Sequence, residues 1–236
     1  MLFFMVPFHR GQCFLGLSRR GGIQMKLNQP KVTEQLTPAT FQDVWLEEDP
    51  YLQNCVVLDS RFDGEMVERA QLTNMLVKNS SFQHASLPDL FITDVRFENC
   101  DFSNADLRGV SIHRASFHNC KMLGVNFADA RFTDVLFEQC IGNLSAFVHA
   151  KWERVLFEQC QLKDADFFDC KLKQTKFSMC NLDSASFDET SLKGVELRSS
   201  EFESMTVSMK DLEGCIVSVR QAVQFAAMMG LDIRDE

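Results

Sequence analysis

The sequence has few of the features by which enzymes and membrane proteins are recognised. It has no C-x-x-C pair, no H-E-x-x-H motif and no glycine-rich phosphate loop, so zinc and nucleotide sites are not indicated. Its histidines are scattered along the chain. No apolar run is long enough for a membrane-spanning helix. We therefore expect a protein that has no catalytic residues, metal or cofactor and does not enter a membrane.

Basic residues are also in the minority. The 236 residues include 24 Lys and Arg against 33 Asp and Glu, which gives a formal net charge of -9. Proteins that bind nucleic acids carry a basic patch against the phosphates. Direct binding of nucleic acid is therefore not expected.

What the sequence does have is a five-residue repeat from Ser60 to Gly214. The third residue of nearly every block is large and apolar, and the residue two places before it is usually small. The other three are mostly polar. A period of five fits neither the helix period of 3.6 nor the strand period of 2. It predicts a coil with corners, in which each block forms one short side and points its large and small residues inward.

The same residue types recur in every fourth block. The small position holds Cys100, Cys120, Cys140, Cys160 and Cys180, and each follows a core phenylalanine by three places: Phe97, Phe117, Phe137, Phe157 and Phe177. A choice that recurs every twenty residues implies four blocks per turn. At about 4.8 Å per turn, roughly eight turns make a rod about 37 Å long.

The cysteines favour a structural interpretation. They interchange with Ala and Ser at equivalent places, as small buried residues do. Their spacing does not match that of a zinc site. Reduced thiols suit a cytoplasmic protein, and we expect this location.

The blocks CDFSN, ADLRG, ASFHN, ARFTD, ADFFD, CNLDS and ASFDE resemble the A(D/N)Lxx motif of the pentapeptide-repeat proteins. The resemblance implies an all-β fold, a right-handed quadrilateral β-helix. Some members, the Qnr and MfpA groups, bind DNA gyrase or topoisomerase IV by imitating duplex DNA. It thus implies a DNA mimic that binds a type II topoisomerase and protects it, for example against quinolones. Loops that contact the topoisomerase in several Qnr members are absent here.

A second interpretation remains open. The chain is then a protein-interaction rod, an immunity or regulatory factor whose partner is unrelated to DNA. Fold alone does not decide between the two, because one fold serves many functions.

The repeat divides the chain into four parts. Residues 1–24 are expected to be disordered, or to precede a true start at Met25. Residues 25–59 form an N-terminal cap and the entry to the first coil, and residues 60–217 form the β-helix. Residues 218–236 form a capping α-helix and a candidate dimerisation strand.

Both ends of the repeat carry capping signals. At the N-terminal end, Phe41, Val44 and Trp45 are expected to cover the first coil. At the C-terminal end, Ser218 and Gln221 form a capping box, and Gly230 is the residue expected after the helix. The predicted apolar face of this helix consists of Ala222, Phe225, Ala226 and Met229. In Qnr-like relatives the corresponding C-terminal segment joins two subunits, so the resemblance implies a homodimer.

Gly142 is the one exception in the large apolar series. A missing core side chain leaves a cavity that costs about 2 to 5 kcal/mol if nothing fills it. Ile141 and Leu144 are apolar where the pattern expects polar residues. We expect one of them to turn inward if the backbone bulges at the glycine, whose φ is free.

A candidate partner surface lies near the middle of the rod. Its acidic members are Asp94, Glu98, Asp134, Glu138 and Glu158, and its apolar members are Leu136, Val148, Leu156 and Phe168. Arg114 and Arg154 interrupt the acidic lines. The alternative is ordinary solubilising charge with scattered surface apolar residues, which need no explanation.

Overall fold

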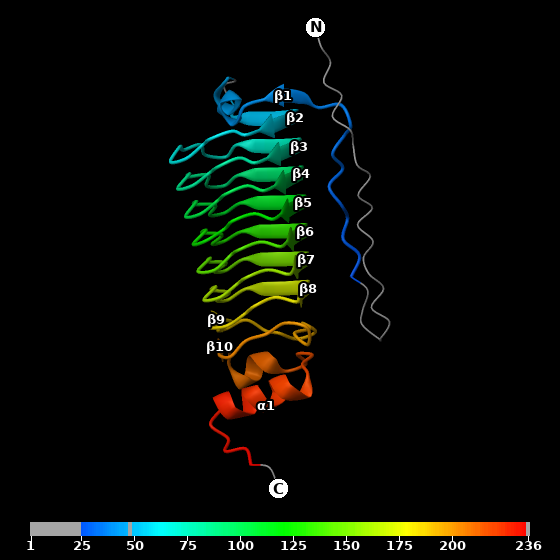
Figure 1. Ribbon diagram of the computed structural model, residues 1–236, viewed down its shortest axis with the longest axis vertical. Coiled ribbons are helices and arrows are strands. Elements are labelled where there is room, and N and C mark those ends of the chain that lie inside the picture. The colour runs from blue at the N-terminus through cyan, green and yellow to red at the C-terminus, as the bar shows by residue number, and fades with distance from the viewer. Residues whose placement is uncertain (1–24, 47–48, 235–236) are drawn as a thin grey trace.

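The chain folds into an elongated four-sided rod of stacked backbone coils (Figure 1). The computed structural model describes residues 25–46 and 49–234. Eight parallel strands follow one another along the rod in chain order, β1 to β8, and from β2 onward neighbours pair twenty residues apart, as Arg131 does with Lys151. No helix in the described part of the chain is long and apolar enough to cross a membrane.

The strands are β1 (Thr37–Ala39), β2 (Tyr51–Leu58), β3 (Gln71–Lys78), β4 (Phe91–Glu98), β5 (Ser111–His118), β6 (Arg131–Glu138), β7 (Lys151–Glu158), β8 (Lys171–Ser178), β9 (Ala185–Ser186) and β10 (Met205–Thr206). Each long strand covers two sides of a coil. Isolated parallel bridges, such as Ile141 with Gln161 and Ala146 with Asp166, hold the other two. The predicted right-handed quadrilateral β-helix of about eight coils is thus confirmed, and it ends in one α-helix, α1 (Val219–Met228).

The corners depend on a backbone conformation that few residues adopt. Every fifth residue from Asn54 to Gly194 has a φ between +47° and +79°. This left-handed region is open to glycine and, among other residues, is best tolerated by Asn and Asp. Gly, Asn and Asp together hold most of the corner places. The polar fifth position of the repeat therefore has a backbone cause as well as a solvation cause.

The core is filled by columns of stacked side chains. Phe97, Phe117, Phe137, Phe157 and Phe177 are all buried. Successive rings lie nearly parallel, with centroids 4.8, 4.9, 4.6 and 5.3 Å apart. This spacing matches the distance between neighbouring strands, so aromatic stacking and backbone pairing share one repeat.

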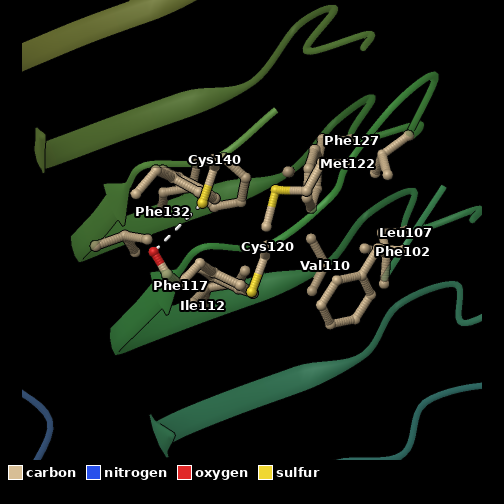
Figure 2. Packing of buried hydrophobic residues seen from close by; sticks show 14 of the residues in the cluster. Phe102, Leu107, Val110, Ile112, Phe117, Cys120, Met122, Phe127, Phe132 and Cys140 are labelled. Carbon is tan, nitrogen blue, oxygen red and sulfur yellow. Dashed lines mark hydrogen bonds between the residues drawn. The ribbon is translucent and has the colours of Figure 1, made fainter. Parts of the chain in front are cut away.

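The cysteine column forms hydrogen bonds to the backbone. The Sγ of Cys140 lies 3.4 Å from the carbonyl oxygen of Phe117, in the preceding coil (Figure 2). Cys160 repeats this contact at 3.4 Å, and the hydroxyl of Ser200 donates to the equivalent carbonyl of Phe177 further along. In a second column, Cys170 and Thr190 donate in the same way to the carbonyls of Phe147 and Phe167. The position therefore favours side chains that are small and can donate. Burial raises the pKa of the Cys170 thiol to about 12, so at neutral pH it keeps its proton.

A short 3-10 helix, Phe41–Trp45, closes the first coil. The ring of Phe41 meets those of Phe62 and Phe82 edge-on, with centroids 4.6 and 4.7 Å away. Val44 is fully buried. Trp45 is 45% exposed, but its ring lies 5.0 Å from that of Phe62. The expected cap at residues 25–59 is therefore built mainly on Phe41 and Val44.

Helix α1 begins at the expected capping box. The backbone N–H of Gln221 donates to Oγ of Ser218 at 3.3 Å, and the N–H of Ser218 donates to Oε1 of Gln221 at 2.9 Å. The helix is followed by Gly230, with a φ of +85°. Its buried face differs from the predicted one. Phe225 is buried against Phe202, but Ala222 and Met229 are exposed and Ala226 is half-buried.

Glutamine side chains replace the missing part of that face. The amide of Gln221 is buried and donates to the carbonyls of Leu197 at 2.7 Å and Ser200 at 2.8 Å. The amide of Gln224 donates to the carbonyl of Phe202 at 2.9 Å. These carbonyls belong to the last coils, so the helix satisfies acceptors that another coil would otherwise pair. Counting apolar residues alone cannot reveal this role.

The expectation for Gly142 is wrong. Ile141 and Leu144 point outward and are 43% and 61% exposed. The backbone does not bulge, because Gly142 donates to the carbonyl of Gln161 at 2.7 Å and Ile141 pairs in register with the coils on both sides. A Cβ added at Gly142 would lie only 3.1 Å from Cδ2 of Leu162. The side chain of the next coil therefore already occupies this space.

The largest core side chain lies on the opposite side of the same coil. Trp152 follows Gly142 by two blocks, which is half a turn of a four-sided coil. It is 2% exposed, and its ring centroid lies 5.3 Å from those of both Phe147 and Phe157 on the adjoining sides. The smallest and the largest core residues thus lie half a turn apart, and we infer that Trp152 and Leu162 together compensate for the glycine.

This pairing predicts a coupled effect on stability. Trp152→Leu alone should cost about 2 to 4 kcal/mol through a cavity, and Gly142→Leu alone about 1 to 3 kcal/mol through overpacking. The double variant should be more stable than the sum predicts by about 1 to 2 kcal/mol. Denaturant unfolding followed by circular dichroism measures all three. Additive losses would show that the two positions do not share their space.

Candidate interaction surface of the rod

The outward residues form straight rows because each coil adds twenty residues. We name the four sides by the core residue that each carries in the coil of residues 151–170: the Trp152 side, the Phe157 side, the Leu162 side and the Phe167 side. The Trp152 side is opposite the Leu162 side, and the Phe157 side is opposite the Phe167 side. Each side can then be described by its rows of charge.

The predicted partner surface does not form one patch. Glu98, Glu138, Glu158, Leu136 and Leu156 lie on the Phe157 side; Val148 and Phe168 lie on the opposite Phe167 side; Asp94 and Asp134 lie at the corner between the Trp152 and Phe157 sides. Residues five apart in sequence lie on adjoining sides, and residues ten apart lie on opposite sides. Nearness along the chain therefore does not mean nearness on the rod.

Several members of that surface are paired or covered. Glu98 forms an ion pair with Lys78, and Glu138 lies against His118, each at 2.7 Å. Leu156 is only 9% exposed. On the Phe167 side, Phe168 is 38% exposed. Of the predicted apolar residues, it is the one most open to a partner.

The corner row that contains Asp94 and Asp134 alternates in sign. Arg114 donates to both carboxylate oxygens of Asp94 at 2.7 and 2.6 Å. Arg154 does the same to Asp134 at 2.7 and 2.9 Å. Each arginine lies one coil beyond its partner, so the row consists of two bidentate ion pairs. It presents little net charge.

An extended segment, residues 25–36, runs along this corner and is called the strap (Figure 1). The backbone N–H and the side-chain amide of Asn28 donate to the two oxygens of Asp134 at 3.1 and 3.0 Å. The side chain of Asp134 is 1% exposed. Asp134 is therefore not accessible to a partner, and its assignment to the predicted partner surface was wrong.

Hydrogen bonding sets the titration of both corner acids. Burial alone would raise the pKa of Asp134, but the bonds from Arg154 and Asn28 outweigh it and lower the pKa to about 2. The bond from Arg114 likewise lowers the pKa of Asp94, against a smaller effect of burial. Both carboxylates are thus ionised at neutral pH and neutralised locally.

Free acidic charge gathers instead on the Phe167 side. Its outward and corner rows hold Glu68, Asp89, Asp106, Asp129, Asp166, Asp169, Asp188 and Glu189, against Arg69 and Arg108. That is eight acids and two bases, a net charge of -6. The Trp152 side is the reverse, with Asp94, Asp134 and Glu153 against Arg114, Arg131, Lys151, Arg154, Lys171, Lys173 and Lys193.

Few ion pairs reduce this acidic charge. Asp106 pairs with Arg108 at 2.8 Å, Asp169 with His149 at 3.1 Å and Glu189 with Lys210 at 2.8 Å. Within residues 25–46 and 49–234, Asp129 and Asp188 have no basic partner within 4.0 Å. Sequence inspection missed this side because its acids are spread over three rows.

A sequence model of the pentapeptide repeat region matches residues 90–167 and 150–216. Together the two matches cover more than half of the chain. The chain belongs to the pentapeptide-repeat family. A search among characterised proteins gave no relative with significant sequence similarity.

Solved structures similar to this pentapeptide-repeat protein include three of the same repeat class. A trypsin-treated variant of QnrB1, a plasmid-mediated fluoroquinolone resistance protein, is 16% identical, with 76% of this chain and 99% of that chain covered and a TM-score of 0.37. HetL, involved in heterocyst differentiation regulation in the cyanobacterium Nostoc sp. strain PCC 7120, is 15% identical, with 71% and 89% covered and a TM-score of 0.28. Rfr23 from the cyanobacterium Cyanothece 51142 is 12% identical, with 75% and 96% covered and a TM-score of 0.14.

The C-terminal end of the pentapeptide-repeat rod carries an apolar surface. An open groove of about 400 Å³ is lined by Met205, Thr206, Val207, Phe225, Met228 and Met229. At the same end of the rod, Val219 is 84% exposed, Leu231 63% and Ile233 46%. Residues 231–234 form no strand within the single chain, so the dimerisation strand stays a prediction.

The lowered pKa of Asp134 predicts a specific acid sensitivity. A carboxyl whose pKa falls from 3.8 to about 2 on folding stabilises the fold above the unfolded value, and this contribution is lost as the pH falls toward 2. Between pH 5 and pH 2, the melting temperature of Asp134→Asn should therefore fall by less than that of the parent. Asp129→Asn, which removes one carboxylate from an exposed corner, is the control. An equal change in both variants would mean that total charge, and not the Asp134 site, sets the acid sensitivity.

Proposed function

We propose that this protein is a non-enzymatic rod whose acidic Phe167 side binds a type II topoisomerase at the surface that otherwise holds DNA. DNA gyrase is the partner that we propose first. The observation that carries the proposal is the excess of acids on one side of the rod, where eight acids stand against two bases. The family resemblance supports the choice of partner, since some pentapeptide-repeat proteins act in this way.

The density of acidic charge is comparable to that of one DNA strand. From Glu68 to Glu189 the rod rises by six coils, about 29 Å at roughly 4.8 Å per coil. Eight acids over this length give one per roughly 3.6 Å, against about 3.4 Å per phosphate along one strand. Two bases lower the net density to one charge per roughly 4.8 Å. The side thus imitates one strand better than a whole duplex.

The shape of the rod favours binding over catalysis. Its charged side chains lie in parallel rows, whereas a catalytic site needs groups that converge on one substrate atom. Among the described residues, no three His, Cys, Asp or Glu side chains lie close enough to hold a metal ion. A stiff scaffold that keeps charges at fixed spacing is suited to recognition by a basic protein groove.

A gyrase assay tests this function. Purified protein at micromolar concentration should change DNA supercoiling by gyrase, or reduce the DNA cleavage that a fluoroquinolone stabilises. The variant Asp89→Asn/Asp129→Asn/Asp169→Asn should be at least about tenfold less potent, because it removes three charges from the acidic side. Asparagine tolerates the left-handed corners, so the fold should remain.

A matched control separates this side from net charge. The variant Glu98→Gln/Glu138→Gln/Glu158→Gln removes the same charge from the opposite Phe157 side and should keep the parent's potency. Equal losses in both variants would mean that overall charge decides the effect. If the parent protein changes neither supercoiling nor drug-stabilised cleavage, the topoisomerase is not its partner, and a rod with a partner unrelated to DNA remains.

We also propose that two copies associate through their C-terminal ends. The groove beside α1 is lined mainly by apolar residues, and Val219, Leu231 and Ile233 at the same end of the rod are also exposed. Large exposed apolar patches are typical of protein contacts. The end of a rod is also where a second copy can add without covering the acidic side.

The oligomeric state tests this contact. Light scattering after gel filtration should give twice the chain mass of 27.0 kDa for the parent protein. Leu231→Asp/Ile233→Asp should be monomeric, because it places two charges in the apolar contact. Ile141→Asp/Leu144→Asp changes two exposed apolar residues at mid-rod and should remain dimeric. A monomeric parent protein would rule out the dimer.

A further inference from the structure

The strap is held mainly through its backbone. The N–H groups of Asn28, Lys31 and Thr33 donate to side-chain oxygens of Asp134, Asp94 and Asn74 at 3.1, 2.9 and 2.8 Å. Two side-chain contacts add to them: the Asn28 amide donates to Asp134, and the Asn74 amide donates to the Thr33 hydroxyl at 2.9 Å. The three acceptors lie on one corner row, and coils separate them at fixed steps.

The distance that the strap advances per residue fits the rise from coil to coil. Five residues of strap, Asn28 to Thr33, span the three coils between Asn74 and Asp134. Three coils rise about 14 Å at roughly 4.8 Å each, so the strap advances about 2.9 Å per residue. That is close to the 3.1 Å rise of a polyproline II chain, whose backbone donors are free of internal hydrogen bonds.

The acceptors are organised before the strap arrives. Arg114 fixes the carboxylate plane of Asp94, and Arg154 fixes that of Asp134, each through two N–H groups. Each carboxylate then has lone pairs left, which accept from the N–H groups of the strap. A preorganised acceptor loses less side-chain entropy when a ligand binds.

The strap is also two-sided in polarity. Met25, Leu27, Pro30 and Val32 are half-buried, whereas the residues between them are exposed. None of residues 25–33 is acidic, although two are lysines. A carboxylate on this stretch would lie near Asp94 and Asp134 and be repelled. The core itself takes nothing from the strap, because the buried cluster begins at Phe41.

We propose that the corner row of Asn74, Asp94 and Asp134 is a binding site for extended peptides and that the strap is its occupant within the same chain. The ligand class is an extended protein segment that has no acidic side chain opposite Asp94 and Asp134, that turns apolar residues toward the rod, and that has free N–H groups at the spacing of the coils. When the strap leaves, a partner segment of this kind takes its place.

Proline substitutions open the site without changing it. The full-length variant Asn28→Pro/Lys31→Pro removes two backbone donors of the strap and the side-chain amide of Asn28, while the polyproline II conformation remains allowed. Lys26→Pro/Gln29→Pro is the matched control, because neither of these N–H groups donates to the row. Hydrogen exchange across residues 32–36 should become faster in the first variant and stay slow in the second.

The probe is a fluorescein-labelled peptide of residues 25–36, followed by fluorescence anisotropy. The opened variant should bind it saturably, and both the parent and the control at least tenfold more weakly, because a tethered strap competes at high effective concentration. In the opened background, Asp94→Gly/Asp134→Gly should lose at least tenfold in affinity. Glycine suits these left-handed corners, so the coils are kept while the acceptors are removed.

Each other outcome overturns the proposal. A released strap with no saturable peptide binding would mean that the row holds peptides only as part of a folded chain. Equal binding with and without the two carboxylates would place the peptide elsewhere. If the parent protein were a dimer that only the Asn28→Pro/Lys31→Pro variant dissociates, the strap would be exchanged between copies instead of opening a site.

Discussion

The rod depends on the hydrogen bonds by which each coil binds the coil twenty residues away, such as that from the N–H of Phe102 to the carbonyl of Lys121 at 2.7 Å. These bonds place every outward residue directly over its counterpart, so charges in one row meet at a spacing of about 4.8 Å. Like charges in direct register are destabilising. The corner row of Asp94 therefore alternates acid with base. On the acidic side, Asp89, Asp129 and Asp169 occur in every second coil, separated by Gly109 and His149. Glu189 follows Asp169 directly in this row, and Lys210 pairs with it at 2.8 Å.

The fold could be predicted from the sequence because the constraint is local and repeated. A period of five residues, with the same residue types recurring every twenty, determines the number of sides and the residues that fill the core. The capping box at Ser218 follows equally local rules, and it is formed. The prediction at Gly142 was wrong because it sought a substitute only among the residues next to the glycine in the chain. Trp152, half a turn away, is a residue that a map of the four sides would have indicated.

The surface was harder to predict because it depends on which rows adjoin. Glu138 and Phe168 are close to the middle of the rod, yet they lie on opposite sides. The roles of Gln221 and Gln224 depend on carbonyls left open by the last coils. The alternating apolar residues of the strap do not identify its binding site, since the strap is held there by backbone N–H groups that every residue except proline possesses. None of these contacts leaves a pattern in the sequence near the residues that make them.

The strap also has a consequence for the order of events during synthesis. Asn28 precedes its acceptor Asp134 by 106 residues, so at about 5 to 20 residues per second roughly 5 to 20 s pass between their appearance. The coils from residue 51 onward can add one after another as they emerge, each on the surface of the last. The strap cannot dock until the fifth of them exists. Its docking thus reports that this half of the rod has been assembled in register, because a coil out of step would move the acceptors away from the donors.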